Sequence, residues 1–175
     1  PILAIGGANF VDVFPISQFL DGSRDAADPP ILEFDRFEAD FTDEHYGASI
    51  AVSGDGTRLA VGAPGAYIGA HDVGMVQIYQ VGAGQIGAES FGLAWTDIFG
   101  SAVALSEDGT MVAVGALTGS SGAGYVRVFS QSGAKWNQIG QTIEGRHLGD
   151  NLGKSLSISA DGQTVAIGAY QADAD

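Results

Sequence analysis

Residues 99–116 read FGSAVALSEDGTMVAVGA, and the chain carries this phrase three times. The other copies are YGASIAVSGDGTRLAVGA at 46–63 and LGKSLSISADGQTVAIGA at 152–169. The glycine at the second position recurs with a spacing of 53 residues. A fixed period of this length with strand-like content indicates that one supersecondary unit is stacked repeatedly, as in propellers and arrays.

Each copy predicts a β-hairpin. Its first run alternates in the manner of a strand, and its second run reads LAVGA, VAVGA or VAIGA. The runs are joined by Ser-x-Asp-Gly, in which Gly accepts a positive φ and Asp can hydrogen-bond its own backbone. The first strands are expected at 49–53, 102–106 and 155–159.

Two further strands are expected after each hairpin. A third strand with an aromatic end is predicted at 74–79 and 124–129, and a weaker fourth at 85–87 and 136–140. Four short antiparallel strands in about fifty residues form one propeller blade. The sequence therefore predicts an all-β fold of β-propeller-like blades, with about 3.3 repeats of ~53 residues in a partial propeller or blade array.

The repeat pattern extends to the N-terminus, because residues 2–7 and 10–14 match the second and the third strand of the repeat. It therefore divides the whole chain into blades and partial blades. The expected parts are a partial blade at 1–14, an acidic insertion with an outer strand at 15–45, blades at 46–98 and 99–151, and a partial blade with the first hairpin at 152–175. The chain is thus expected to begin and end inside a repeat, as a processed or partial product that lacks an initiator Met. Uncovered faces and edges associate, so we expect no free-standing monomer: other residues or another copy should cover the ends. The N-terminal partial repeat could accept the C-terminal hairpin of another chain or of a longer parent chain.

Composition excludes several classes of function. The 21 acidic and 7 basic residues give a formal net charge of −14, which disfavours nucleic acid and anionic lipid as partners. Nine of the acids lie in residues 21–44, a segment expected to be a solvated loop in preference to a surface for cations or a basic partner. The chain has no Cys, which excludes disulfides and thiolate metal sites. No apolar stretch predicts a transmembrane segment, and Pro1 opens no signal peptide.

The repeat resembles the FG-GAP repeat of integrin α-subunit propellers. The resemblance rests on residues 99–105, 112–116 and 124–129, and residues 62–64 supply the literal Gly-Ala-Pro. It covers most of residues 46–169. It implies a β-propeller that is extracellular or at the cell surface and that serves adhesion or protein recognition.

The hairpin turn departs from the calcium-binding form of that family, which carries several carboxylates in one loop. Here each turn has one, Asp55, Asp108 or Asp161, whereas calcium takes six to eight oxygen ligands. We therefore expect these residues to make the turn, with no metal and no cofactor. The turn also resembles the S-x-D-G of TolB-type and WD40-like propellers and, more distantly, the Asp-box of sialidases, which implies blade architecture and carries over no catalytic activity.

No catalytic constellation is apparent. His45, His71 and His147 occupy different offsets and are expected in loops or at the surface, with His71-Asp72 as a remote acid–base pair. The serines recur in register and mark blade geometry, where a nucleophile would be singular; they are Ser53, Ser106 and Ser159. The GAGQIG of residues 82–87 mimics a dinucleotide fingerprint but precedes no predicted helix.

The aromatic residues have two interpretations. Those that open the repeat (Tyr46, Phe99) or close the third strand (Tyr79, Phe129) are expected to be buried in packing. A carbohydrate-binding propeller would instead use exposed rings as sugar platforms, and the candidates are Tyr67, Trp95, Tyr125 and Trp136.

The sequence as a whole favours a non-catalytic module for protein interaction or structural assembly. Its partners are expected to be proteins or further copies of itself, with glycan as a possible ligand and with contacts in loops 64–74 and 117–124 and segment 15–44. The alternatives are a lectin-like propeller, a propeller glycosidase or lyase, and a calcium-stabilised adhesion domain. The enzyme would need a singular carboxylate cluster in the central channel, and residues 21–44 supply many candidates without distinguishing any.

Overall fold

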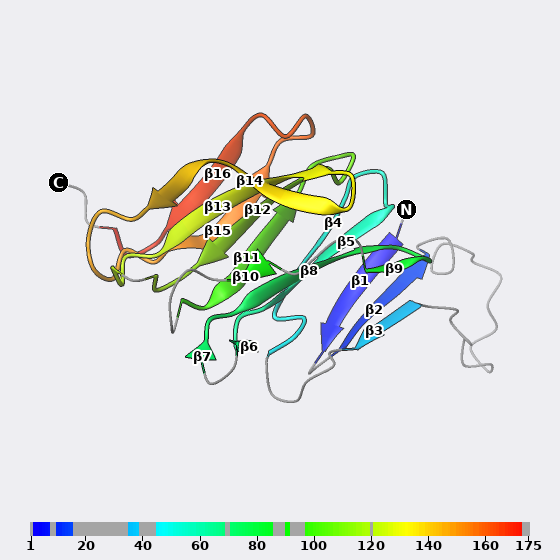
Figure 1. Cartoon of the computed structure of the whole chain (residues 1–175), viewed down its shortest axis with the longest axis horizontal. Coiled ribbons are helices and arrows are strands. Elements are labelled where there is room, and N and C mark those ends of the chain that lie inside the picture. Colours follow the sequence, from blue (N-terminus) through cyan, green and yellow to red (C-terminus); the bar gives the residue numbers. More distant parts are fainter. Residues whose placement is uncertain are drawn as a thin grey trace, which may run out of the picture.

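The computed structural model describes residues 2–7, 10–15, 35–38, 45–68, 71–85, 90–91, 97–119 and 121–172. These residues form strands and turns and contain no helix, and all strand pairs within the sheets are antiparallel. The predicted all-β class is therefore confirmed. The main sheets follow one another in chain order along the longest axis of the molecule (Figure 1).

Sheet I consists of β1 (Ile2–Gly7), β2 (Phe10–Pro15) and β3 (Asp35–Glu38), in that order. Sheet II has the order β10-β8-β5-β4, formed by β4 (Ser49–Val52), β5 (Arg58–Ala63), β8 (Met75–Gln80) and β10 (Ser90–Phe91), and β9 (Gly84–Gln85) also pairs with β8. Sheet III contains β11 (Phe99–Leu105), β12 (Met111–Ala116), β13 (Tyr125–Ser132) and β14 (Lys135–Glu144) in sequential order. Sheet IV contains β15 (Leu152–Ile158) and β16 (Val165–Ala169), and a small hairpin joins β6 (Tyr67–Ile68) to β7 (His71–Asp72).

The three predicted hairpins are confirmed as β4–β5, β11–β12 and β15–β16, and the predicted third strands as β8 and β13. The fourth strand expected at 136–140 lies within β14, and β3 supplies the outer strand expected in segment 15–45. The fourth strand expected at 85–87 differs, because β9 includes only Gly84 and Gln85 and residues 86–87 lie outside the described residues. Loop 64–74 contains the β6–β7 hairpin, which the sequence did not predict.

Consecutive sheets touch backbone to backbone at pairs of glycines. A Cβ atom on Gly62 would lie 2.1 Å from the Gly100 carbonyl oxygen, and one on Gly115 would lie 2.3 Å from that of Gly153. A Cβ atom on Gly6 would likewise lie 2.4 Å from the carbonyl oxygen of Gly47. No side chain fits at these contacts, so they explain why the second strand and the start of the next repeat both carry Gly.

Each approaching strand is bulged where it makes this contact. Phe99 pairs with Ala116, but the next pair is Ala102 with Gly115, so β11 carries two extra residues, Gly100 and Ser101, at this point of the ladder. The φ of Gly100 is +88°, which favours glycine. The same slip occurs between Leu152 and Ser155 in β15. A bulge bends the strand locally, and here it lies where the backbone meets the neighbouring sheet.

Backbone hydrogen bonds also join the hairpin turns of successive sheets. The N–H of Asp55 donates to the carbonyl of Glu107 (2.9 Å), and the N–H of Glu107 donates to the carbonyl of Ala160 (3.1 Å). Isolated parallel bridges connect Gly74 to Phe99 and Gly124 to Leu152. The sheets are therefore held by main-chain contacts as well as by side-chain packing.

The core lies between the sheets, and alternate residues of one strand belong to different interfaces. Leu59 and Val61 of β5, both with no exposed surface, pack with Val11 and Val13 of sheet I. Ala60, between them, packs with the large side chains of sheet III. The strand period of two thus places larger residues toward the preceding sheet and a small residue toward the following one.

The aromatic residues predicted to pack in the interior are buried. Tyr46 and Phe99 are 1% and 0% exposed, and Tyr79 and Phe129 are also buried. Phe99 lies 6.3 Å from the ring of Tyr125 and 6.3 Å from the ring of Phe129, measured between centroids. The first residue of the repeat is thus an anchor of the core between sheets II and III.

We expect Gly115→Ala to lower the free energy of unfolding by about 3 kcal/mol, because the new methyl group would collide with backbone atoms of Gly153 that cannot rotate away. The measurement is urea unfolding at neutral pH. The matched control is Gly54→Ala, whose methyl would meet only the flexible side chain of Glu107 and should change stability by less than about 0.5 kcal/mol. Equal stability of the two variants would contradict the glycine contact.

Candidate functional site

The Ser-x-Asp-Gly turns use their polar side chains on their own backbone. Asp108 Oδ1 accepts hydrogen bonds from the Ser106 hydroxyl (2.8 Å) and from the N–H of Thr110 (2.9 Å), while Ser106 Oγ accepts from the N–H of Met111 (3.0 Å). Equivalent bonds hold the other two turns, formed by Ser53, Asp55, Thr57 and Arg58 and by Ser159, Asp161, Gln163 and Thr164. The predicted role of Asp55, Asp108 and Asp161 in the turns is confirmed.

These hydrogen bonds lower the pKa of each carboxyl group. For Asp108 the backbone N–H of Thr110 is the main cause, followed by the Ser106 hydroxyl. For Asp55 the hydroxyl of Ser53 comes first, and for Asp161 that of Ser159. Each carboxylate is therefore engaged as a charged acceptor that closes the turn.

The turns should make stability depend on pH. A carboxyl group whose pKa is lower in the folded protein stabilises the fold in full above its unfolded value of about 3.8, and this contribution is lost as the pH falls through the folded pKa. We expect Asp108→Asn to flatten the decline of the urea midpoint in acid below about pH 4. Glu107→Gln, which neutralises an exposed neighbour in the same turn, is the control; an identical profile for both variants would contradict this account.

No group of three or more His, Asp or Glu side chains within the described ranges could hold a metal ion. Because each turn offers a single carboxylate that already accepts several hydrogen bonds, we expect calcium and EDTA to leave the melting temperature unchanged within error. Differential scanning calorimetry in both conditions tests this. A melting temperature that rises with calcium would favour the calcium-stabilised alternative.

The three histidines lie apart in sequence and in different local structures. His45 is exposed, His71 lies in β7 opposite Ile68, and His147 is exposed in the loop before β15. His71 belongs to connection 64–74, as expected, and this connection folds into the short β6–β7 hairpin.

The fingerprint-like residues 82–87 are described only as far as Gln85. They form a turn followed by β9, and no helix occurs among the described residues to direct an N-terminus at a phosphate. The repeated serines Ser53, Ser106 and Ser159 all bond the aspartate of their own turn. They are therefore structural in all three repeats.

The proposed sugar platforms are not equivalent in the structure. Tyr125 is 4% exposed, so the prediction that it could serve as a platform is wrong: its ring belongs to the core next to Phe99. Trp136 is half-buried against the same core. Tyr67 is 56% exposed in β6, and Trp95 lies outside the described residues.

Most of the acidic segment 21–44 lies outside the described residues, with only Asp35–Glu38 described as β3. In this strand Arg36 reaches across to Asp12 of β2 and donates from Nε to Oδ1 (2.7 Å) and from an Nη atom to Oδ2 (2.8 Å). The guanidinium also lies 4.5 Å from the centroid of the Phe10 ring. The described part of this segment thus belongs to sheet I.

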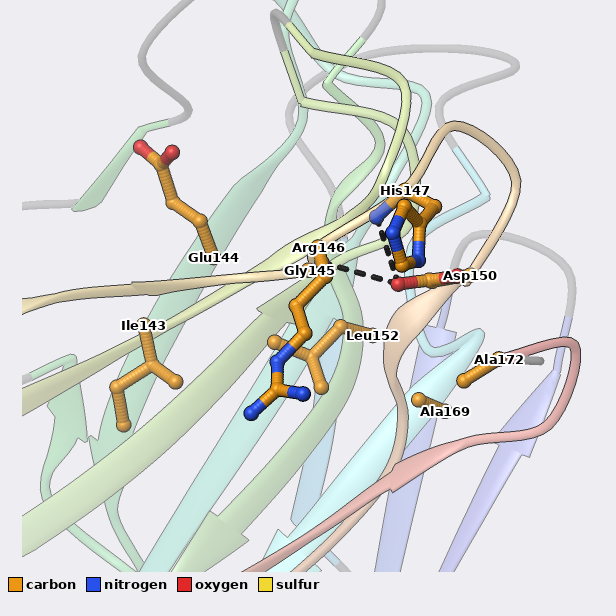
Figure 2. Close-up of a pocket in the computed structure, with 9 residues that line it drawn as sticks. All are labelled: Ile143, Glu144, Gly145, Arg146, His147, Asp150, Leu152, Ala169 and Ala172. Atoms are coloured by element: carbon orange, nitrogen blue, oxygen red, sulfur yellow. Dashed lines mark hydrogen bonds between the residues drawn. The ribbon is translucent and has the colours of Figure 1, made fainter. Parts of the chain in front are cut away.

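A cavity of about 280 Å³ lies between the end of β14, the loop before β15 and the end of β16 (Figure 2). Its lining residues are Ile143, Glu144, Gly145, Arg146, His147, Asp150, Leu152, Ala169 and Ala172. Asp150 is only 5% exposed, and its Oδ2 accepts hydrogen bonds from the N–H groups of Arg146 and His147, both at 2.9 Å. Figure 2 shows both bonds meeting on this carboxylate.

Asp150 has a counterpart 53 residues earlier, which the sequence interpretation missed. Asp97 is fully buried, and its Oδ2 accepts a hydrogen bond from the hydroxyl of Tyr125 (2.7 Å). The repeat pattern indicates this pair, because Asp97 and Asp150 each lie two residues before the first residue of a repeat.

The residue directly before the first residue of each repeat has a strained backbone. His45, Ile98 and Asn151 have φ angles of 54°, 57° and 53°, and all three stand directly before the first residue of a repeat. A positive φ is rare for a β-branched residue such as Ile98. The shared angle shows that the chain enters every repeat through the same sharp bend.

No protein-family model matches the chain, and no curated protein sequence matches it. Among solved structures, the chain is similar to hydrazine synthase of Kuenenia stuttgartiensis, with 19% sequence identity and a TM-score of 0.46. The similarity covers 69% of this chain and spans 28% of that protein's chain. A TM-score this low supports no argument about fold or activity.

Proposed function

We propose that this chain forms part of an FG-GAP-like β-propeller or blade array that works as a non-catalytic module for protein interaction or structural assembly. The proposal includes an adhesive role at the cell surface or in an extracellular assembly. Support comes from the hairpin repeat and from the resemblance of residues 99–129 to the FG-GAP pattern.

The observation that carries the proposal is an exposed apolar face on sheet I. Leu3 and Ile5 of β1 are 39% and 48% exposed. Their counterparts in β5, Leu59 and Val61, have no exposed surface, because sheet I covers them. A face of the kind that the fold buries elsewhere can be covered by a further blade or by a protein partner.

The non-catalytic part of the proposal is supported by what the repeated polar residues do. Aspartates and serines recur in three turns, and their side chains form hydrogen bonds within the turn itself. Catalytic groups work as singular constellations within hydrogen-bond reach of one another and of a substrate.

The charge of the chain favours protein partners over nucleic acid. Within its described residues, the structure contains no apolar helix of the length that a membrane crossing requires. Both observations are compatible with a module that recognises proteins.

We expect the face of sheet I to mediate association. Light scattering across a concentration series should give a mass above the 17.9 kDa of one chain, and Leu3→Ser with Ile5→Ser should reduce that mass toward the monomer. Leu148→Ser is the matched control, because Leu148 is 82% exposed but lies in the loop before β15. A monomer at all concentrations that also captures no protein partner would contradict the proposal, as would saturable sugar binding on a glycan array.

The acidic segment can be tested separately. Val13 of β2 pairs with Asp35 of β3, so a short Gly-Ser linker can replace residues 17–33 and keep both strands. We expect the melting temperature to stay within a few degrees and the association to change, because loops carried on a sheet scaffold make contacts without holding the core. Loss of folding would show that the segment is part of the core.

A further inference from the structure

The outer edge of sheet III runs along β14, the longest strand that the structure describes. Sheet III already contains the four strands of the repeat. In the described part of the chain β14 pairs with β13 alone, so the N–H and C=O groups on its other side form an open edge. An open edge of this length is a template on which another strand can pair.

The sequence of this strand is suited to pairing with itself. Residues 136–143 read WNQIGQTI, a run without a charge or a proline that is rich in β-branched, aromatic and amide side chains. Segments with high β-propensity, low charge and no proline are those that stack with identical copies of themselves. Charged residues occur only at the two ends of the strand, as Lys135 and Glu144, where they oppose aggregation of the segment between them.

The outer strand of sheet I is protected in a different way. β3 includes only Asp35–Glu38, and three of these four residues are charged. Short length and charge both make an edge a poor template. The middle of β14 has neither form of protection, so the geometry of the strand there decides whether its edge can pair.

A bulge interrupts the middle of β14. The ladder between β13 and β14 places the single residue Arg127 opposite residues 140–142. Gly140 has a φ of +65°, and no atom beyond its chain neighbours lies within 4 Å of the position that a Cβ atom would occupy there. A bulge leaves its extra residues out of the ladder and bends the strand. The edge of β14 is therefore not straight.

The extra residues do not re-aim the side chains of the strand. Ile143 pairs with Val126 and Ile139 pairs with Val128, so the two isoleucines on either side of the bulge face the same side of the sheet. A ladder without the two extra residues would orient them identically, because side chains alternate with a period of two. The main consequence of the bulge is thus the shape of the edge.

Side chains hold the bulge in place. Gln138 Nε2 donates to the carbonyl of Gly140 and to Oγ1 of Thr142, both at 3.4 Å. Gln138 Oε1 accepts a hydrogen bond from Arg127 Nε (2.6 Å), and this guanidinium lies 4.9 Å from the centroid of the Phe129 ring. Hydrogen bonds and a cation–π contact therefore connect the bulge to the core.

We propose that the bulge at residues 140–142 prevents the outer edge of β14 from pairing with β14 of a second copy of the chain. A straight edge would offer a continuous row of N–H and C=O groups to an identical, uncharged strand. The bulge breaks this row in the middle, where no charged side chain does so. This surface is separate from the apolar face of sheet I, and the inference does not rest on the proposed function.

The first test is a matched pair of substitutions at Gly140, an exposed position with room for a side chain. Gly140→Asn keeps the bulge because Asn tolerates a positive φ, whereas Gly140→Val disfavours it because a β-branched residue does not. Both are made in the Leu3→Ser, Ile5→Ser protein, the reference protein, to remove association through sheet I. In light scattering across a concentration series we expect Gly140→Asn to keep the mass of the reference protein and Gly140→Val to reach about twice that mass or more.

A deletion tests the same edge more strongly. Removing Gly140 and Gln141 from the reference protein places Thr142 opposite Arg127 and keeps the flanking pairs in register. We expect this variant to melt cooperatively, to associate and to raise thioflavin T fluorescence. Adding Asn137→Lys, which places a charge in the middle of the straightened edge, should return its mass to that of the reference protein.

A deletion variant that folds and keeps the mass of the reference protein would overturn the proposal. Association that Asn137→Lys does not reduce would also count against it, since the contact would then lie elsewhere. If a non-cooperative melt shows that the deletion prevents folding, the Gly140 pair decides, and equal masses for Gly140→Asn and Gly140→Val would refute the role of the bulge. None of these outcomes bears on the sheet I proposal, which is tested by comparing the parent chain with the reference protein.

Discussion

The close approach of consecutive sheets at glycine pairs is the constraint on which the fold depends. Because a carbonyl oxygen occupies the space of a Cβ atom at Gly62 and Gly115, the sheets can meet only where both strands lack a side chain. The bulge at Gly100 follows from the same contact, since the strand must turn its carbonyl toward the neighbouring sheet. The strained bend at Ile98 delivers the chain to that position. Two departures from regular strand geometry are thus consequences of one contact.

The contact also determines the asymmetry of side-chain size within each sheet. Once two backbones touch, the face beside Gly62 has room only for small residues such as Ala60, while the opposite face carries Leu59 and Val61. Leu59 and Val61 pack on valines of the preceding sheet, and Ala60 packs under the aromatic residues of the following sheet, so consecutive layers interdigitate. An array built this way has a direction, with a different kind of face at each end.

Much of this architecture could be predicted from the sequence because its signals are local. The Ser-x-Asp-Gly turn closes through bonds within six residues, so the hairpins and the roles of Asp55, Asp108 and Asp161 could be inferred from spacing alone. The burial of Phe99 followed from its repeated position. The sheet contacts could not be derived in the same way, since they join residues 38 positions apart, as in Gly62 and Gly100. The burial of Tyr125, a candidate ring in the carbohydrate-binding alternative, could not be inferred from spacing because its partner, Asp97, lies 28 residues earlier.

Asp97 and Asp150 occupy the same position in consecutive repeats but have different surroundings. Both carboxylates are buried at the same bend, yet one accepts the hydroxyl of Tyr125 and the other lines a cavity. The difference lies in whether a third strand runs beside the hairpin, and not in the hairpin itself. The same bend thus holds a buried carboxylate in both repeats, although different groups donate hydrogen bonds to it.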